Sequence, residues 1–254
     1  MRIKNKHFLI PDTQCKKGVA LNHLEAAGNY ILDKMPNVII HLGDHWDMPS
    51  LSSYDKGTAL AEGMRYEQDI QAGIKGMELL FKAINKYNAT HKKKYTPRKI
   101  FLLGNHEERI LRHVNANPEL IGTLGFKDFN LQKYGWEVPK YLEMVEVDDV
   151  YYSHYFYNPN NGKPYTGRAS NMLNTLGFSF TMGHRQGKDV AEKHLTNGKT
   201  LRGLVAGSYY QHEEVYKGPQ GDNYWRGCLM CHEVHQGNYS LMELSLQYLL
   251  DKWL

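Results

Sequence analysis

Short apolar runs alternate along the chain with longer segments in which apolar residues recur at helical spacing. The short runs predict buried strands at residues 7–10, 38–42, 100–103, 150–153 and 178–182, because each is brief and rich in Phe, Ile, Leu, Val or Tyr. Apolar positions three or four apart predict helices at about residues 19–35 and 59–87. This strand-helix-strand order favours parallel pairing and an α/β architecture.

The C-terminal part of the chain, about residues 201–250, is richer in strand-like runs and has a predicted hairpin turn at Gly237-Asn238. Strands without intervening helices indicate a second, more antiparallel sheet. We therefore expect two packed mixed sheets flanked by helices. No internal repeat, low-complexity tract or Gly/Ser linker interrupts the 254 residues, so a single domain spanning 1–254 is predicted.

The composition is that of an ordinary globular protein, with 41% hydrophobic and 23% charged residues. The net charge of +4 permits an anionic substrate without requiring one. Three cysteines provide no disulfide framework, and no apolar run approaches the roughly 20 residues of a membrane span. With no signal-peptide pattern at the N-terminus, we expect a soluble, cytoplasmic protein that does not bind membranes.

Five predicted strands each end near a residue that can bind a metal ion. In open α/β sheets ligands collect at the carboxyl ends of the strands, so these residues would converge on one edge. A single Asp or His at a strand end is more often a turn, cap or structural residue, but five in succession favour a metal site. The five are Asp12, Asp44, Asn105, His154 and His184.

Taken in order, these segments resemble the successive motifs of calcineurin-like metallophosphoesterases. The resemblance covers about residues 7–186. Within the family, the sequence as a whole, including residues 51–57, resembles phosphoesterases predicted in bacteriophage genomes. The motifs that carry it are Asp12, Gly43-Asp44-His45-Trp46-Asp47, Gly104-Asn105-His106-Glu107, His154 and Gly183-His184.

The resemblance implies a double β-sandwich with two divalent metal ions at one site. Asp44 would bridge the ions, Asn105, His154 and His184 would complete one of them, and Asp12 would bind the other. Two close cations clamp a phosphate and activate water for in-line attack. The implied reaction is phosphoester hydrolysis by a metal-activated hydroxide.

His106 would be the general acid for the leaving oxygen, because the pKa of imidazole lies near neutrality. Asp47 and Glu107 are candidates for carboxylates that orient such groups, although surface or capping roles fit them equally. Arg185, between two predicted site residues, is a candidate for contacting the substrate phosphate, with a simple salt bridge as the alternative.

Two positions depart from the family pattern, because Gln14 and Gln186 stand where the family usually has histidines. Both would serve the metal bound by Asp12. Amide oxygens make that position harder and weaker, which favours Mn²⁺, with Mg²⁺, Fe or Zn²⁺ as alternatives. Either one ion of the pair is easily lost, or both glutamines line the pocket beside a single working metal.

The expected substrate is a phosphodiester in DNA, RNA or a nucleotide, as for a nuclease. A phosphomonoesterase acting on phosphoprotein or a small molecule is the alternative, as is a degenerate protein that binds phosphate without turnover. The basic run at residues 91–94 precedes the third strand, so we expect a solvated loop far from the metals. Cys228 to His232 matches a haem-attachment string, but in a strand residues three apart face opposite sides.

Overall fold

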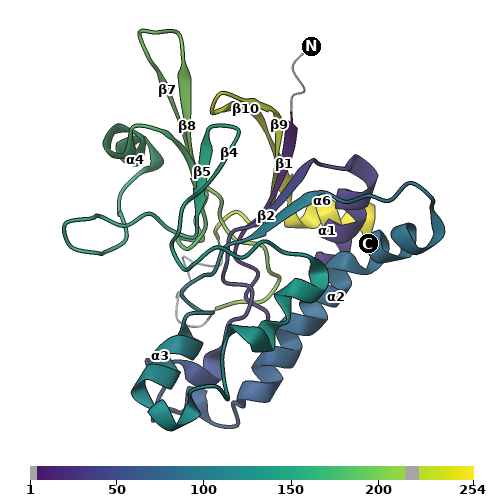
Figure 1. Cartoon of the computed structure of the whole chain (residues 1–254), viewed down its shortest axis with the longest axis vertical. Helices are drawn as coiled ribbons and strands as arrows, with labels where there is room; N and C mark the ends of the chain where they lie inside the picture. The colour runs from purple at the N-terminus through teal and green to yellow at the C-terminus, as the bar shows by residue number, and fades with distance from the viewer. Residues whose placement is uncertain (1–4, 215–222) are drawn as a thin grey trace.

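Ten strands form two five-stranded sheets in the computed structural model, which describes residues 5–214 and 223–254 (Figure 1). In spatial order the first sheet contains β10 (Asn238–Ser245), β9 (Gly227–His235), β1 (Asn5–Ile10), β2 (Val38–His41) and β3 (Arg98–Phe101). The second contains β4 (Val145–Val147), β5 (Val150–Ser153), β6 (Ser179–Met182), β8 (Thr200–Val205) and β7 (Asp189–His194).

Both sheets are mixed. In the first, β1, β2 and β3 pair in parallel, while β9 pairs antiparallel with β1 and β10. In the second, β5, β6 and β8 pair in parallel, while β4 and β7 are antiparallel edges. The predicted α/β architecture of two mixed sheets flanked by helices is therefore confirmed.

The helices cover the outer sides of the sheets (Figure 1). Three of them, α1 (Asn22–Lys34), α2 (Tyr66–Thr90) and α6 (Leu246–Trp253), lie beside the first sheet, and α4 (Ala169–Leu176) packs on the second. The helix α3 (Arg109–Ala116) follows β3. Short 3-10 turns are η1 (Pro49–Leu51), η2 (Ala59–Ala61), η3 (Pro118–Leu120), η4 (Phe126–Phe129) and η5 (Leu131–Tyr134).

Alternation along β1 shows how one strand serves two cores. Phe8 and Ile10 pack in the core shared with the helices, whereas Leu9 packs in the core between the sheets. Cys228 and Cys231 of β9 divide in the same way, so their thiols face opposite sides of the sheet, as predicted. These residues cannot form the haem or zinc site that the sequence string formally matches.

The predicted helix at 59–87 is wrong at its start, because α2 begins at Tyr66. Residues 59–61 form only the 3-10 turn η2. Gly63 has a φ of +72° and Arg65 is extended, so the backbone leaves helical geometry between the two elements. Apolar spacing continued across this break, which is why periodicity alone predicted one helix.

The end of β3 and the turn of the β9–β10 hairpin also differ from the predicted positions. β3 ends at Phe101, two residues before the predicted end, and residues 102–104 begin a loop. The β9–β10 hairpin turns at Gln236 and Gly237, with φ values of +51° and +76°, one residue earlier than predicted. Positive φ at both central residues suits the twist of a two-residue hairpin.

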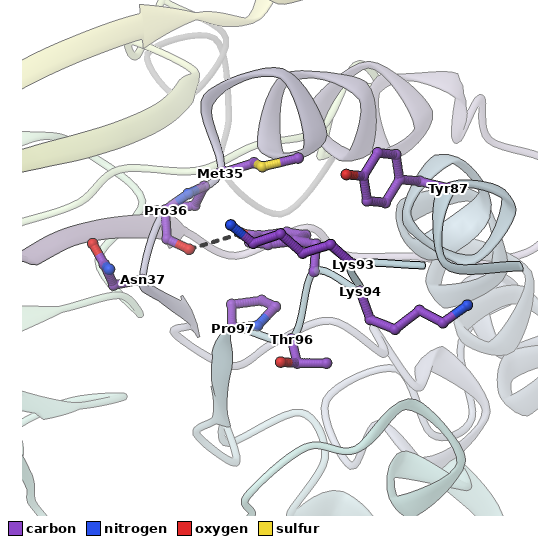
Figure 2. A pocket seen from close by; sticks show the side chains of 9 residues that line it. Met35, Pro36, Asn37, Tyr87, Lys93, Lys94, Thr96 and Pro97 are labelled. Carbon is purple, nitrogen blue, oxygen red and sulfur yellow. Dashed lines mark hydrogen bonds between the residues drawn. The ribbon is translucent and has the colours of Figure 1, made fainter. Parts of the chain in front are cut away.

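The basic loop at 91–94 lies where the sequence placed it, at the amino ends of β2 and β3. There Lys93 and Lys94, with Tyr87 and Pro97, line an open cavity of about 370 Å³ (Figure 2). The loop is exposed and lies at the edge opposite the carboxyl ends of the parallel strands. Within the described ranges, no helix combines the length and hydropathy needed to cross a membrane.

Candidate metal centre

The loops after β1, β2 and β3 of the first sheet and after β5 and β6 of the second bring the predicted metal-binding residues together. Asp44, His154 and His184 follow β2, β5 and β6, and they offer ligand atoms that all lie within 4.8 Å of one another. Asp44 and His154 are buried and His184 is partly buried. The three side chains form a compact oxygen and nitrogen donor set that could hold a metal ion.

Asn105, in the loop after β3, completes this donor set. Its Oδ1 lies 3.0 Å from His154 Nε2 and 2.7 Å from His184 Nδ1. The other ring nitrogen of His154, Nδ1, donates to the Leu42 carbonyl at 2.7 Å. That bond orients the ring, so Nε2 faces Asn105 and Asp44, where a bound cation would take the place of its proton.

The charges within this cluster are strongly coupled. Burial alone would raise the pKa of Asp44, but the charges of His106 and His154 hold it below its usual range. Burial would lower the pKa of His154, and Asp44 instead raises it to about 9. Burial and the charge of His154 lower the pKa of His184 to about 4. Asp44 is therefore an ionised carboxylate, and a cation would compete with a proton for His154.

Asp12, after β1, lies against the same cluster. Its Oδ1 accepts the backbone N–H of His184 at 3.0 Å. Its Oδ2 is buried and has no hydrogen-bond partner within residues 5–214 and 223–254. Burial, and next the charge of Asp44, raise the pKa of Asp12 to about 7. A buried carboxylate oxygen without a donor is costly unless a cation or proton neutralises it, so this position fits a metal ligand.

Both glutamines at the altered positions are buried beside Asp12 and Asp44. The backbone N–H of Gln14 donates to the Asp44 carbonyl at 2.9 Å. The Oε1 of Gln186 accepts a hydrogen bond from the Tyr210 hydroxyl at 2.8 Å. This hydrogen bond is consistent with a Gln186 side chain that only lines the pocket. Because Oε1 has a second lone pair, Gln186 could also bind a metal ion.

Four of the predicted site residues have backbones in the left-handed region. The φ values are 45° for Gln14, 49° for Asp44, 65° for His184 and 57° for Gln186. Residues with a Cβ rarely adopt this region, and such strain concentrates at functional sites. The loops are therefore held in this conformation by the surrounding fold rather than by local preference.

Gly104 allows the loops after β2 and β3 to meet. A Cβ placed there would lie 2.1 Å from Asp44 Oδ1 and 2.4 Å from Asp44 N. Any larger residue would push Asp44 away, so glycine is required where the two loops meet.

His106 and Asp47 form a hydrogen-bonded pair beside the cluster. The Nδ1 of His106 lies 2.8 Å from Asp47 Oδ1, and its Nε2 lies 3.8 Å from Asp44 Oδ2. Burial would lower the pKa of His106, but Asp44 and the hydrogen bond to Asp47 raise it. Asp47 thus orients the ring, with Nδ1 as the donor to the carboxylate and Nε2 turned toward the cluster.

Lys16 and Glu214 extend this pair in a way the sequence did not reveal. Lys16 Nζ lies 3.1 Å from Asp47 Oδ2 and 2.7 and 2.8 Å from the two oxygens of Glu214. Burial would lower the pKa of Lys16, but both carboxylates together raise it. The ammonium group therefore holds Asp47 in place from the side opposite His106.

For the phosphoester hydrolysis that the sequence predicts, with His106 as general acid, replacing Lys16 by Met should slow the reaction of esters with poor leaving groups by about tenfold, because outer groups that orient the residues of a metal site typically contribute 10- to 100-fold. Rates for p-nitrophenyl esters, whose leaving group departs unprotonated, should change little. The exposed neighbour Lys17→Met is the matched control. Equal slowing of both ester types by Lys16→Met would contradict an effect through His106.

Glu107 stabilises the loop that carries Asp44. Its carboxylate accepts backbone N–H groups from Gly104, Asp44, His45 and Trp46 at 2.7 to 2.9 Å. The side chain is fully buried. The sequence left open whether Glu107 had a surface or an orienting role, and the structure shows a buried carboxylate that shapes the ligand loop.

The change Glu107→Gln is expected to destabilise the fold by about 3 kcal/mol, because the amide group would face backbone donors and leave buried N–H groups unpaired. Guanidinium unfolding monitored by tryptophan fluorescence would measure this. The exposed Glu119→Gln should unfold like wild type. A Glu107→Gln protein as stable as wild type would show that its amide finds other acceptors.

Arg109 is an arginine at the cavity that the sequence did not indicate. Arg185 donates to the Gly167 carbonyl. Arg109, at the start of α3, lines a cavity of about 410 Å³ together with Asp44, His106 and His184. Its guanidinium lies 3.3 Å from His106 Nε2 and donates to the Asp47 carbonyl at 2.7 Å. Its position one turn after the Gly104-Asn105-His106-Glu107 segment is the signal that could have identified it.

A scan against protein-family models finds none that matches this chain, and a search of curated proteins likewise finds no match. The chemistry of the site therefore rests on the residues and distances above.

Proposed function

We propose that this protein is a metal-dependent phosphoesterase of the calcineurin-like kind, which hydrolyses a phosphodiester. The observation that carries the proposal is the donor set of Asp44, His154 and His184 around the Asn105 amide, with the His106–Asp47 pair beside it. A metal site next to a histidine poised as a general acid is the arrangement that phosphoester hydrolysis requires.

Two metal positions are proposed. Asp44, Asn105, His154 and His184 would hold one ion, and Asp12 with Asp44 would hold the other, near Gln14 and Gln186. Oxygen ligands predominate around Asp12, which favours Mn²⁺ or Mg²⁺ there. A divalent cation supplies Lewis acidity and positive charge, which activate water and offset the charge of the phosphoryl group.

The protein's own groups perform the remaining steps. Burial and the charge of Arg109 lower the pKa of His106, but Asp44 and Asp47 raise it. His106 would present a proton on Nε2 to the leaving oxygen once the Arg109 guanidinium, which contacts Nε2, turned to the phosphate. Asp47 holds the ring through Nδ1, and Lys16 holds Asp47. Arg109 adds a positive charge to the cavity wall, where it would attract the phosphate.

The proposal is tested by metal-stripped protein reloaded separately with Mn²⁺, Mg²⁺, Fe²⁺ or Zn²⁺. Substrates should include bis-p-nitrophenyl phosphate, p-nitrophenyl phosphate and single-stranded DNA. Turnover of the diester with Mn²⁺ is expected. Preference for the monoester would indicate a phosphomonoesterase, and binding of phosphate without turnover under any metal would overturn hydrolysis in favour of a binding protein.

A further inference from the structure

A second cavity adjoins the metal centre along one face of α3. It has a volume of about 610 Å³ and shares Ser52, Tyr54, Asn105 and Arg109 with the cavity that contains Asp44. We call this cavity the α3 groove. Because the two cavities have these wall residues in common, a ligand at the metal centre could extend directly into the α3 groove.

The walls of the α3 groove are basic. They carry four basic side chains, and no carboxylate is among the described residues that line it. Three of them project from one face of α3, since positions three and four apart lie on the same side of a helix. The fourth comes from the loop opposite. The four are Lys56, Arg109, Arg112 and His113.

An exposed aromatic ring stands where the two cavities meet. Tyr54 is 88% exposed and lines both of them. A ring this exposed has little contact with the rest of the fold, and an aromatic ring in a positively charged groove can stack an unpaired base. Cations alone would suit any polyanion, whereas the added ring favours nucleic acid with accessible bases.

We propose that the α3 groove binds the part of a single-stranded nucleic acid that flanks the scissile phosphodiester. This rests on the proposed function, whose substrate it specifies. Lys56 and Arg112 contact flanking phosphates, and a base stacks on Tyr54. A phosphorylated peptide, with one concentrated charge, would leave the more distant cations of the groove unused.

The proposal is tested by comparing a thymidine dinucleotide with a decanucleotide as substrates. The decanucleotide is expected to have a KM at least about tenfold lower, because only it reaches the groove. Tyr54→Ala should raise its KM by about tenfold, from the loss of one stacked base. Binding is measured with His106→Asn protein, which should not cleave the decanucleotide. In this protein, Lys56→Gln and Arg112→Gln should each reduce the steepness of the plot of log binding constant against log salt concentration by about 0.7.

Controls separate this inference from the proposed function. Lys56→Gln should hydrolyse bis-p-nitrophenyl phosphate at the wild-type rate, because that small diester does not reach the groove. Lys93→Gln, in the distant basic cavity of Figure 2, should leave decanucleotide binding unchanged. Equal KM values for the two lengths, or a phosphopeptide bound more tightly than the decanucleotide, would overturn the inference. Failure to hydrolyse both the small diester and the decanucleotide would instead overturn the proposed function.

Discussion

On the proposed function, the Asp44→Asn protein is expected to bind divalent cations far more weakly than wild type. It should hydrolyse bis-p-nitrophenyl phosphate at least about a thousandfold more slowly, since metal ions contribute several kcal/mol to such transition states. Asp44 is the only carboxylate in the cluster it forms with His154 and His184 in the described part of the chain. Asn has the same shape and can still accept the His106 backbone N–H through Oδ1, so the loop should persist.

Metal content after dialysis, measured by mass spectrometry, together with kcat/KM would check this result. Asp148→Asn is the matched control, because Asp148 is an ionisable partner of His7 outside the cluster and should not affect metal. The same dialysis distinguishes the two hypotheses for Gln14 and Gln186. Two ions before dialysis and one afterwards support an asymmetric pair, whereas one ion both before and after dialysis supports a pocket-lining role. An Asp44→Asn protein that retained the wild-type metal content would contradict the assigned cluster.

Replacing His106 by Asn should lower kcat for esters with poor leaving groups by about 10²- to 10⁴-fold, the usual contribution of a general acid. The effect should shrink as the leaving group becomes more acidic, because a good leaving group departs without a proton. The metal content should remain that of wild type, since Asp44, Asn105, His154 and His184 are untouched.

A series of aryl diesters with graded leaving groups would measure this dependence. His113→Asn is the control, since His113 lies on α3 and lines the α3 groove instead of the cavity with Asp44. In the double variant His106→Asn with Lys16→Met, the loss of Lys16 should lower kcat little further, because Lys16 acts on the leaving oxygen only through the proton of His106. A uniform loss of activity across the series, with loss of metal, would show that His106 serves the metal site structurally.

Much of the fold could be predicted because a buried strand requires a short, local run of apolar residues. β1, β2, β5 and β6 fall where apolar runs predicted them, and Asp44, His154 and His184, which follow β2, β5 and β6, belong to one cluster. The start of α2 was predicted too early because the helix is interrupted by the backbone and not by a change in the apolar pattern. Gly63 and Arg65 depart from helical geometry while the apolar spacing continues, so a backbone break is invisible to a pattern of side chains.

The sequence by itself determined that five predicted strands are each followed by a residue that can bind a metal ion. It also indicated that these residues would meet, because ligands collect at the carboxyl ends of parallel strands. Only the tertiary structure decided which groups meet there. Lys16 and Glu214 are 198 positions apart, and Arg109 rather than Arg185 lines the cavity. The left-handed backbones of Asp44 and His184 are likewise imposed by the packed loops, because local preference disfavours them and only distant contacts can hold them.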